Sequence, residues 1–329
     1  MRRLFLFAPF LGEKIAAQSA KNTGPSMTDN QRGATFMMLS MAAFVLNDTF
    51  VKLLGGHIPL FEILFLRGIV ATVALVIMCW YLQALKFQHS ARDWMLMIAR
   101  SASEIAAAYF FLTALIHMPI ANVTAILQTL PLTVSLGGVL FFKNPIGWRR
   151  LLAILVGFGG MMLIVRPGSD GFDVYSIYVL IAVLCVTARD LTTRAMSKAV
   201  PSLFVTLLAS LSVTVYSGIM MIGADFTPMS GLDQFYLLAS AFFIIGGYAF
   251  SVLVMRVGDI SFVALFRYSA VIWTLFIGLW VFGEWPDALT LIGATIIALS
   301  GGYTMLREAR IRRHSTTAKS DQHRRYSRF

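Results

Sequence analysis

The charged side chains inside the apolar segments of this chain are the residues best placed to do chemistry. Each costs at least about 2.5 kcal/mol at the centre of a bilayer, so it has to face a polar cavity or an oppositely charged partner. Such residues typically mark the path of a polar solute or a coupling ion through a membrane. The nine are Asp48, Glu62, Glu104, Asp190, Lys52, Arg67, Arg100, Arg189 and Arg267.

Three acid–base pairs stand four residues apart, a spacing that places both members on one face of a helix. These pairs are Asp48 with Lys52, Arg100 with Glu104, and Asp190 with Arg194. The first and third lie near opposite membrane faces, as expected of two gates that open in alternation. The alternative is that such pairs only join neighbouring helices, and it is the favoured interpretation of the pair formed by Asp190.

Five of the charged residues are predicted to line a central cavity. Arg267 lies eight residues into its segment and Arg100 about as deep, so neither side chain easily reaches the interface. Nearby aromatic and hydrogen-bonding groups suit a planar or polyol-bearing metabolite, although such rings also pack between helices or face lipid. The five are Glu62, Arg67, Arg100, Glu104 and Arg267, and their companions are Tyr109, Gln128, Tyr248, Tyr268 and Trp273.

The elements that must hold these residues are membrane-spanning helices. A chain that is 58% hydrophobic and only 13% charged cannot hide its apolar surface in a water-soluble fold. Its apolar runs are long and lack the alternating pattern of an outer-membrane barrel. We therefore predict an all-α integral membrane protein with ten transmembrane helices, near residues 34–54, 60–84, 94–116, 119–142, 149–166, 174–196, 202–224, 234–256, 259–282 and 288–306.

The sequence also predicts an internal repeat. Asp48 and Pro59 have counterparts 142 positions later at Asp190 and Pro201, and Asn144 corresponds to Glu284 at an offset of 140. Five helices per repeat is an odd number, so the second repeat enters the membrane from the opposite side, which predicts two inverted five-helix repeats. The predicted organisation is a basic N-terminal segment, 1–33, the repeats 34–166 and 174–306, and a basic tail, 307–329.

Charge placement predicts the orientation of the bundle. Lys and Arg accumulate in cytoplasmic loops, and placing both termini in the cytoplasm puts most basic residues on that side. The net charge of +11 is therefore a topological signal, and a nucleic-acid partner is not expected. The basic tail can touch anionic lipid head groups, so membrane lipid is an expected partner.

The N-terminal segment allows two interpretations. Arg2 and Arg3 before an apolar stretch resemble a short signal peptide, but Pro9 interrupts that stretch. The favoured interpretation is a flexible leader or an over-extended start, with Met27 as an alternative beginning.

Nothing in the sequence indicates an enzyme. It has no His-Glu-x-x-His zinc motif, no serine elbow and no cysteine cluster, so neither a cofactor nor a metal site is predicted. Cys79 and Cys185 both fall inside predicted spans and are interpreted as small apolar residues.

The combination of these features resembles a known family. Ten spans in two halves, Asn47-Asp48 with Lys52 in the first span, the stretch 59–67 in the second and Phe282-Gly283-Glu284 after the ninth are similar to the EamA-type drug/metabolite transporters. The resemblance covers about residues 33–306. The chain departs from the family pattern after the fourth span, where Asn144 replaces a glutamate.

The resemblance implies a secondary transporter of a small metabolite in the bacterial inner membrane, working by alternating access without nucleotide hydrolysis. Within the family, Asn47-Asp48-Thr49 and the stretch 61–68 are most similar to the riboflavin-uptake branch, so riboflavin is the expected substrate. Two alternatives remain, an exporter of amino acids or amphipathic compounds and a non-transporting membrane scaffold. A homodimer is one open arrangement.

Overall fold

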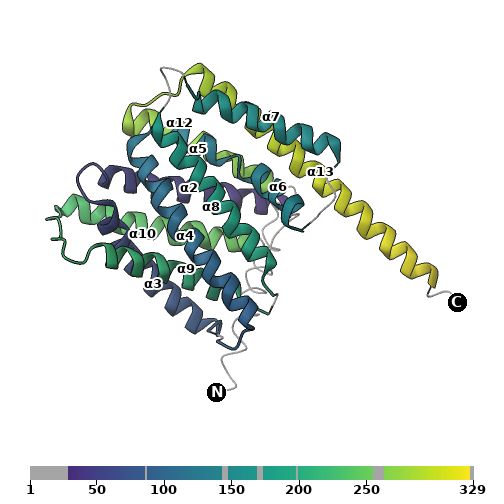
Figure 1. Ribbon diagram of the computed structural model, residues 1–329, viewed down its shortest axis with the longest axis horizontal. Coiled ribbons are helices and arrows are strands. Elements are labelled where there is room, and N and C mark those ends of the chain that lie inside the picture. The colour runs from purple at the N-terminus through teal and green to yellow at the C-terminus, as the bar shows by residue number, and fades with distance from the viewer. Residues whose placement is uncertain are drawn as a thin grey trace, which may run out of the picture.

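The described part of the computed structural model is a bundle of helices (Figure 1). It comprises residues 29–85, 87–142, 147–168, 173–197, 199–254 and 263–326, without the side chains of residues 252 and 308–326. The elements are α2 (Asp29–Leu54), α3 (Leu60–Tyr81), α4 (Ala91–His117), α5 (Ile120–Leu127), α6 (Leu130–Phe142), α7 (Trp148–Val165), α8 (Val174–Ala195), α9 (Ser202–Met220), α10 (Gly231–Val254), the 3₁₀ turn Ala264–Tyr268, α12 (Ser269–Ile277), the π turn Gly278–Phe282 and α13 (Ala288–Tyr326).

The predicted ten-helix membrane fold is confirmed. Ten helical segments of the described chain are long and apolar enough to cross a bilayer. Local signals fix where several of them begin: Ser90 accepts a hydrogen bond from the backbone amide of Asp93, and Asp173 does the same for Tyr175. The predicted N-terminal segment up to residue 28, and Lys143 and Asn144, lie outside the described residues.

Helices from the two predicted repeats pack against each other in pairs. α2 packs on α10 and α4 on α8, while α3 packs on α9 and α7 on α13 (Figure 1). If corresponding helices of the two repeats are exchanged, the α2–α10 contact becomes the α8–α4 contact, and the α3–α9 and α7–α13 contacts remain the same. This pairing agrees with an internal repeat, and the inverted relation between the halves stays a prediction.

The fourth and ninth spans are interrupted at corresponding positions. The fourth breaks at Gln128 and Thr129, between α5 and α6, and Pro131 follows the break. The ninth changes from a 3₁₀ turn to α12 at Tyr268 and then into the π turn before Glu284. Gln128 and Tyr268 stand 140 positions apart, the offset of the predicted repeat. Such paired interruptions are typical of transporter binding regions.

The outer surface of the bundle suits a bilayer. Large apolar side chains such as Ile77, Leu184 and Phe242 are exposed along the spans, where lipid tails replace water. Exposed aromatic residues sit near helix ends, including Trp80 at the end of α3 and Trp148 at the start of α7. Aromatic residues at such positions typically anchor helices at the membrane interface.

Gly293→Ala is expected to destabilise the bundle. α7 and α13 approach closely at Gly160 and Gly293, and a Cβ at Gly293 would lie 2.5 Å from the Gly160 carbonyl oxygen. Overpacking of this kind costs about 1–3 kcal/mol, so the melting temperature of the purified protein should fall. Gly159→Ala is the matched control, because its Cβ would meet nothing within 4 Å. Equal melting temperatures for the two variants would contradict the close packing.

Candidate functional site

The first polar cluster of the bundle joins α2 to α3. Arg67 is only 9% exposed, and its Nη1 donates a hydrogen bond of 2.8 Å to the side-chain oxygen of Asn47. The Asn47 amide in turn donates to the Asp48 carboxylate at 2.9 Å, and Arg67 interacts electrostatically with that carboxylate. Asn47 therefore acts as a bridge that holds a buried cation and an acid in fixed positions.

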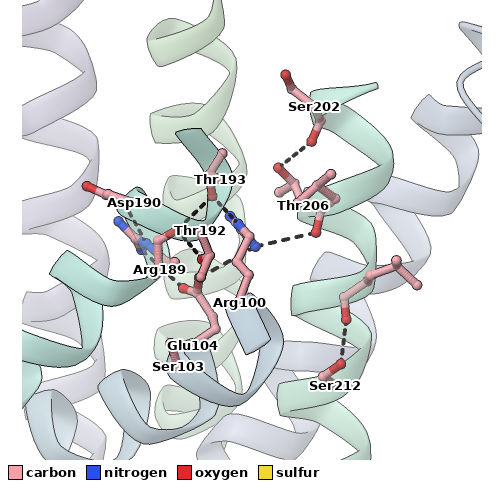
Figure 2. A network of polar contacts seen from close by, with 12 residues as sticks. Arg100, Ser103, Glu104, Arg189, Asp190, Thr192, Thr193, Ser202, Thr206 and Ser212 are labelled. Carbon is pink, nitrogen blue, oxygen red and sulfur yellow. Dashed lines mark hydrogen bonds and ion pairs between the residues drawn. The ribbon is translucent and has the colours of Figure 1, made fainter. Parts of the chain in front are cut away.

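The second polar cluster joins α4 to α8 (Figure 2). Glu104 lies between two guanidinium groups, with Arg189 at 3.3 Å and Arg100 at 3.8 Å from its two oxygens. Arg189 also pairs with the neighbouring Asp190 at 3.0 Å, and Arg100 donates to the Thr193 hydroxyl at 2.9 Å. The predicted pairing of Arg100 with Glu104 is thus confirmed, and the cluster extends to a second helix.

Both clusters contribute to one cavity. It has a volume of about 130 Å³ and lies between α3, α4, α9 and α10. Arg67 of the first cluster and Arg100 and Glu104 of the second line it, together with Tyr248. Tyr248 interacts electrostatically with all three of these residues and packs edge-to-face on Phe44, with ring centroids 5.5 Å apart. The cavity therefore offers charges of both signs, a phenol and an aromatic face.

A third polar contact closes one end of the bundle, which we call the Lys52 end. Lys52 Nζ donates to Glu284 Oε1 at 2.9 Å and also to the Met118 carbonyl oxygen. The other oxygen of Glu284 accepts from the Ile120 backbone amide at 3.2 Å, and Lys52 lies 4.9 Å from the centroid of the Phe282 ring. The pair of Lys52 and Glu284 thus joins α2 to the start of the fourth span and to the segment that follows the ninth.

Two of the three predicted i,i+4 pairings are wrong. In the described part of the chain, Lys52 pairs with Glu284 of the opposite half, and Asp48 is held by Asn47. Asp190 pairs with its neighbour Arg189, while Arg194 lies over the Phe142 ring. The reason is that a long basic side chain reaches partners on adjacent helices, which spacing within one helix does not reveal.

The other predicted site residues lie outside this cavity. Glu62 is buried at the start of α3. Its carboxylate accepts a hydrogen bond of 3.2 Å from the backbone amide of Thr227, so it holds the linker between α9 and α10 in place. Gln128 is 6% exposed and ends α5, at the interruption of the fourth span. Arg267 belongs to the 3₁₀ turn and interacts electrostatically with Asp190.

The two remaining candidates are aromatic. The Tyr268 hydroxyl is buried against α13, so close to Gly301 that a Cβ there would clash with it. Trp273 is 36% exposed on the bundle surface. Neither side chain lines the cavity, and of the five predicted companions Tyr248 is the one that does.

Two residues that the structure makes central, Asn47 and Glu284, were not predicted as site residues, whereas Tyr248 was predicted as a companion of the cavity. Glu284 carried a signal, since it stands in the only copy of the repeat that keeps an acid at that position. Asn47 stands beside an intramembrane acid, where a hydrogen-bonding neighbour is expected. Among the described residues, no three His, Cys, Asp or Glu side chains gather in a way that could hold a metal ion.

A larger groove of about 800 Å³ lies between α6, α7 and α8. Apart from threonine hydroxyls such as those of Thr133 and Thr187, its lining side chains are apolar, and none is charged. Recognition of a polar solute needs hydrogen-bonding groups, so the smaller cavity is the candidate site.

Asp287→Asn is expected to lower stability at neutral pH only. Asp287 lies outside the spans. Its carboxylate accepts hydrogen bonds from Arg166, which has the larger effect, and from Thr290, and together they lower the pKa of this carboxyl to about 2. A lowered pKa means that the ionised carboxylate stabilises the fold above about pH 4, and that this contribution fades as the pH falls through about 2. The carboxyl is 49% exposed, so the effect is small. A difference in melting temperature that grows on acidification would contradict this assignment.

A bundle of apolar spans around a charged cavity defines a multi-pass membrane protein of the transporter class. Residues 31–166 match the EamA-like transporter family. This match covers the first of the two predicted repeats, and together with the ten spans and the relatives described next it supports an EamA-type transporter of small metabolites.

Several relatives differ in the substrates that their names give. An S-adenosylmethionine uptake transporter of Rickettsia felis is 24% identical over 80% of this chain and 89% of its own length. A riboflavin transporter of Vibrio cholerae is 28% identical over 69% of this chain and 78% of its own length. A pseudopaline exporter of Pseudomonas aeruginosa is 24% identical over 82% of this chain and 94% of its own length. One solved crystal structure shares the fold, with a TM-score of 0.57 and 17% identity over 84% of this chain and 98% of that one.

Proposed function

We propose that the chain is an alternating-access carrier that binds its substrate in the cavity between α3, α4, α9 and α10. The observation that supports this is the convergence of Arg67, Arg100, Glu104 and Tyr248 on one cavity inside the spans. Buried charges are costly in a membrane and are retained where a solute or a coupling ion uses them. A non-transporting scaffold would leave this arrangement without a purpose.

Riboflavin uptake is the first substrate candidate. Tyr248 offers a ring for a planar group, and the polar lining, including Thr206 and Ser210, offers partners for ribityl hydroxyls. Relatives named riboflavin transporters support the same substrate. In this proposal both termini are cytoplasmic, and the Lys52 end faces the outside.

A solute with both a carboxylate and an amine is the second candidate. Arg67 and Arg100 can bind a carboxylate, and Glu104 in the same cavity can bind a cation. S-adenosylmethionine has this chemistry, and relatives named for its uptake support it. Export of such a compound would use the same groups in the opposite direction.

Labelled uptake tests the proposal and separates the candidates. Bacteria that cannot make riboflavin would express the chain and receive labelled riboflavin, with and without a protonophore. Proteoliposomes loaded with riboflavin or S-adenosylmethionine would then be tested for exchange of either compound. Riboflavin exchange supports the first candidate, and exchange of S-adenosylmethionine alone supports the second. If a correctly inserted protein exchanges neither compound nor amino acids, the transport proposal fails for these classes.

A further inference from the structure

The end of the bundle opposite to the Lys52 end carries its own cation, Arg194, which lies over an aromatic ring as Lys52 does. Arg194 corresponds to Lys52 in the predicted repeat at an offset of 142, and Phe142 corresponds to Phe282 at an offset of 140. Both cations lie over their aromatic partner, Lys52 at 4.9 Å and Arg194 at 5.3 Å from the ring centroid. The two contacts are therefore similar in distance.

Among the residues whose side chains are described, only one of the two cations has a carboxylate partner. Lys52 pairs with Glu284, whereas Arg194 makes no ion pair with any of the residues whose side chains are described. The residue that corresponds to Glu284 is Asn144, which lies outside the described residues and enters here only by its identity. An amide carries no charge, so an exposed guanidinium remains for an external anion.

The apolar groove begins beside this cation. Phe142, on which Arg194 lies, lines the groove, as do Leu191 and Ala195 on either side of Arg194 in α8. α6 lies between the α7–α13 pair and α8 (Figure 1). Groove-lining residues such as Leu140 and Leu184 are exposed at membrane depth, so lipid tails have access to the groove.

We propose that this groove holds one acyl chain of an anionic glycerophospholipid whose phosphate pairs with Arg194. An anion beside a long apolar tail matches a guanidinium beside an apolar groove in both charge and shape. The lining residues of this groove and of the substrate cavity do not overlap, so the lipid site does not depend on the proposed transport function.

Native mass spectrometry of the full-length protein tests the proposal. The purified protein would be exchanged into mixtures of phosphatidylglycerol and phosphatidylcholine with identical acyl chains. We expect retention of phosphatidylglycerol to exceed that of phosphatidylcholine about fivefold, the factor that one basic residue near the surface typically provides. Arg194→Gln should remove this preference. Arg149→Gln is the matched control, because Arg149 also lies over an exposed ring, that of Trp148, away from the groove.

The acyl part of the proposal has its own variant. Ala188 is exposed in the groove wall, and Ala188→Phe should displace about two methylene groups and weaken retention of both lipids about tenfold. The proposal fails if Arg194→Gln keeps the preference for phosphatidylglycerol, or if Ala188→Phe retains both lipids as the wild type does. Full competition by glycerol phosphate, which has no acyl chain, would show a simple anion site and would also overturn it.

Discussion

Arg67→Ala is expected to abolish transport while the protein still reaches the membrane. Arg67 is the most buried of the charged residues that line the cavity, and it interacts with Asn47, Asp48 and Tyr248. Truncating one member of a buried, hydrogen-bonded charge pair costs about 2–5 kcal/mol, so the initial uptake rate should fall about 30-fold or more. The measurement is labelled uptake normalised to the amount of protein in the membrane. Arg149→Ala, at an exposed arginine outside the cavity, should transport normally.

A second variant separates binding from structure. If Arg67 only neutralises Asp48, then Arg67→Ala/Asp48→Asn should recover transport, because no buried charge is left unpaired. If Arg67 binds substrate, the double variant should recover melting temperature but not uptake. Full recovery of uptake in the double variant would therefore remove Arg67 from the binding site.

The sequence predicted the ten spans, because a long apolar run is a local property, and three of the five charged residues expected at a cavity, Arg67, Arg100 and Glu104, line the one observed. Long apolar runs leave no alternative to a helix in a bilayer, and an intramembrane charge such as Arg67 or Glu104 is costly wherever it lies. The cavity that these two residues line was thus predictable in composition. Which of the predicted aromatic residues lines it was not predictable, since Tyr248 and Trp273 both lie within predicted spans and only the packed structure shows that Tyr248 reaches the cavity.

Pairing between helices was the part that spacing could not predict. Lys52 has an acid four residues earlier, yet it bonds across the bundle to Glu284, which lies in the linker after the ninth span. Glu62 stands five residues before Arg67, but it accepts hydrogen bonds from the Thr227 amide because its helix begins beside that linker. Depth along a helix is readable from sequence, whereas the neighbour at that depth depends on the packing of the whole bundle.

Glu284→Gln is expected to open the Lys52 end of the bundle. The glutamate joins Lys52 to the Ile120 amide, and the pair is only 8% and 28% exposed. Hydrogen bonds to a charged group contribute about 1.5–3 kcal/mol, and glutamine keeps a neutral bond, so the change should favour the open form by about 1.5 kcal/mol. This corresponds to roughly a tenfold change in the ratio of open to closed protein.

Cysteine labelling measures this shift directly. Cys79 and Cys185 would be replaced by alanine, and Ala108→Cys would place one thiol in the cavity lining. A membrane-impermeant thiol reagent, applied separately to each face in oriented vesicles, should label this cysteine faster from the Lys52 end in Glu284→Gln. The reversed pair Lys52→Glu/Glu284→Lys should restore slow labelling, because opposite charges again join the two halves.

The control for this experiment lies in the same linker. Asp287 pairs with Arg166 three residues beyond Glu284, but that pair is more exposed and joins helix ends away from the cavity. Asp287→Asn should leave the labelling rate unchanged, since an exposed ion pair contributes little. Equal acceleration in both variants would show general loosening of the linker, and no acceleration in Glu284→Gln would show that Lys52 and Glu284 do not hold this end closed. Selective acceleration of labelling in Glu284→Gln alone is the outcome expected of an alternating-access gate. The contacts of such a gate must break while the fold stays intact, and they must still keep the closed form the more populated one.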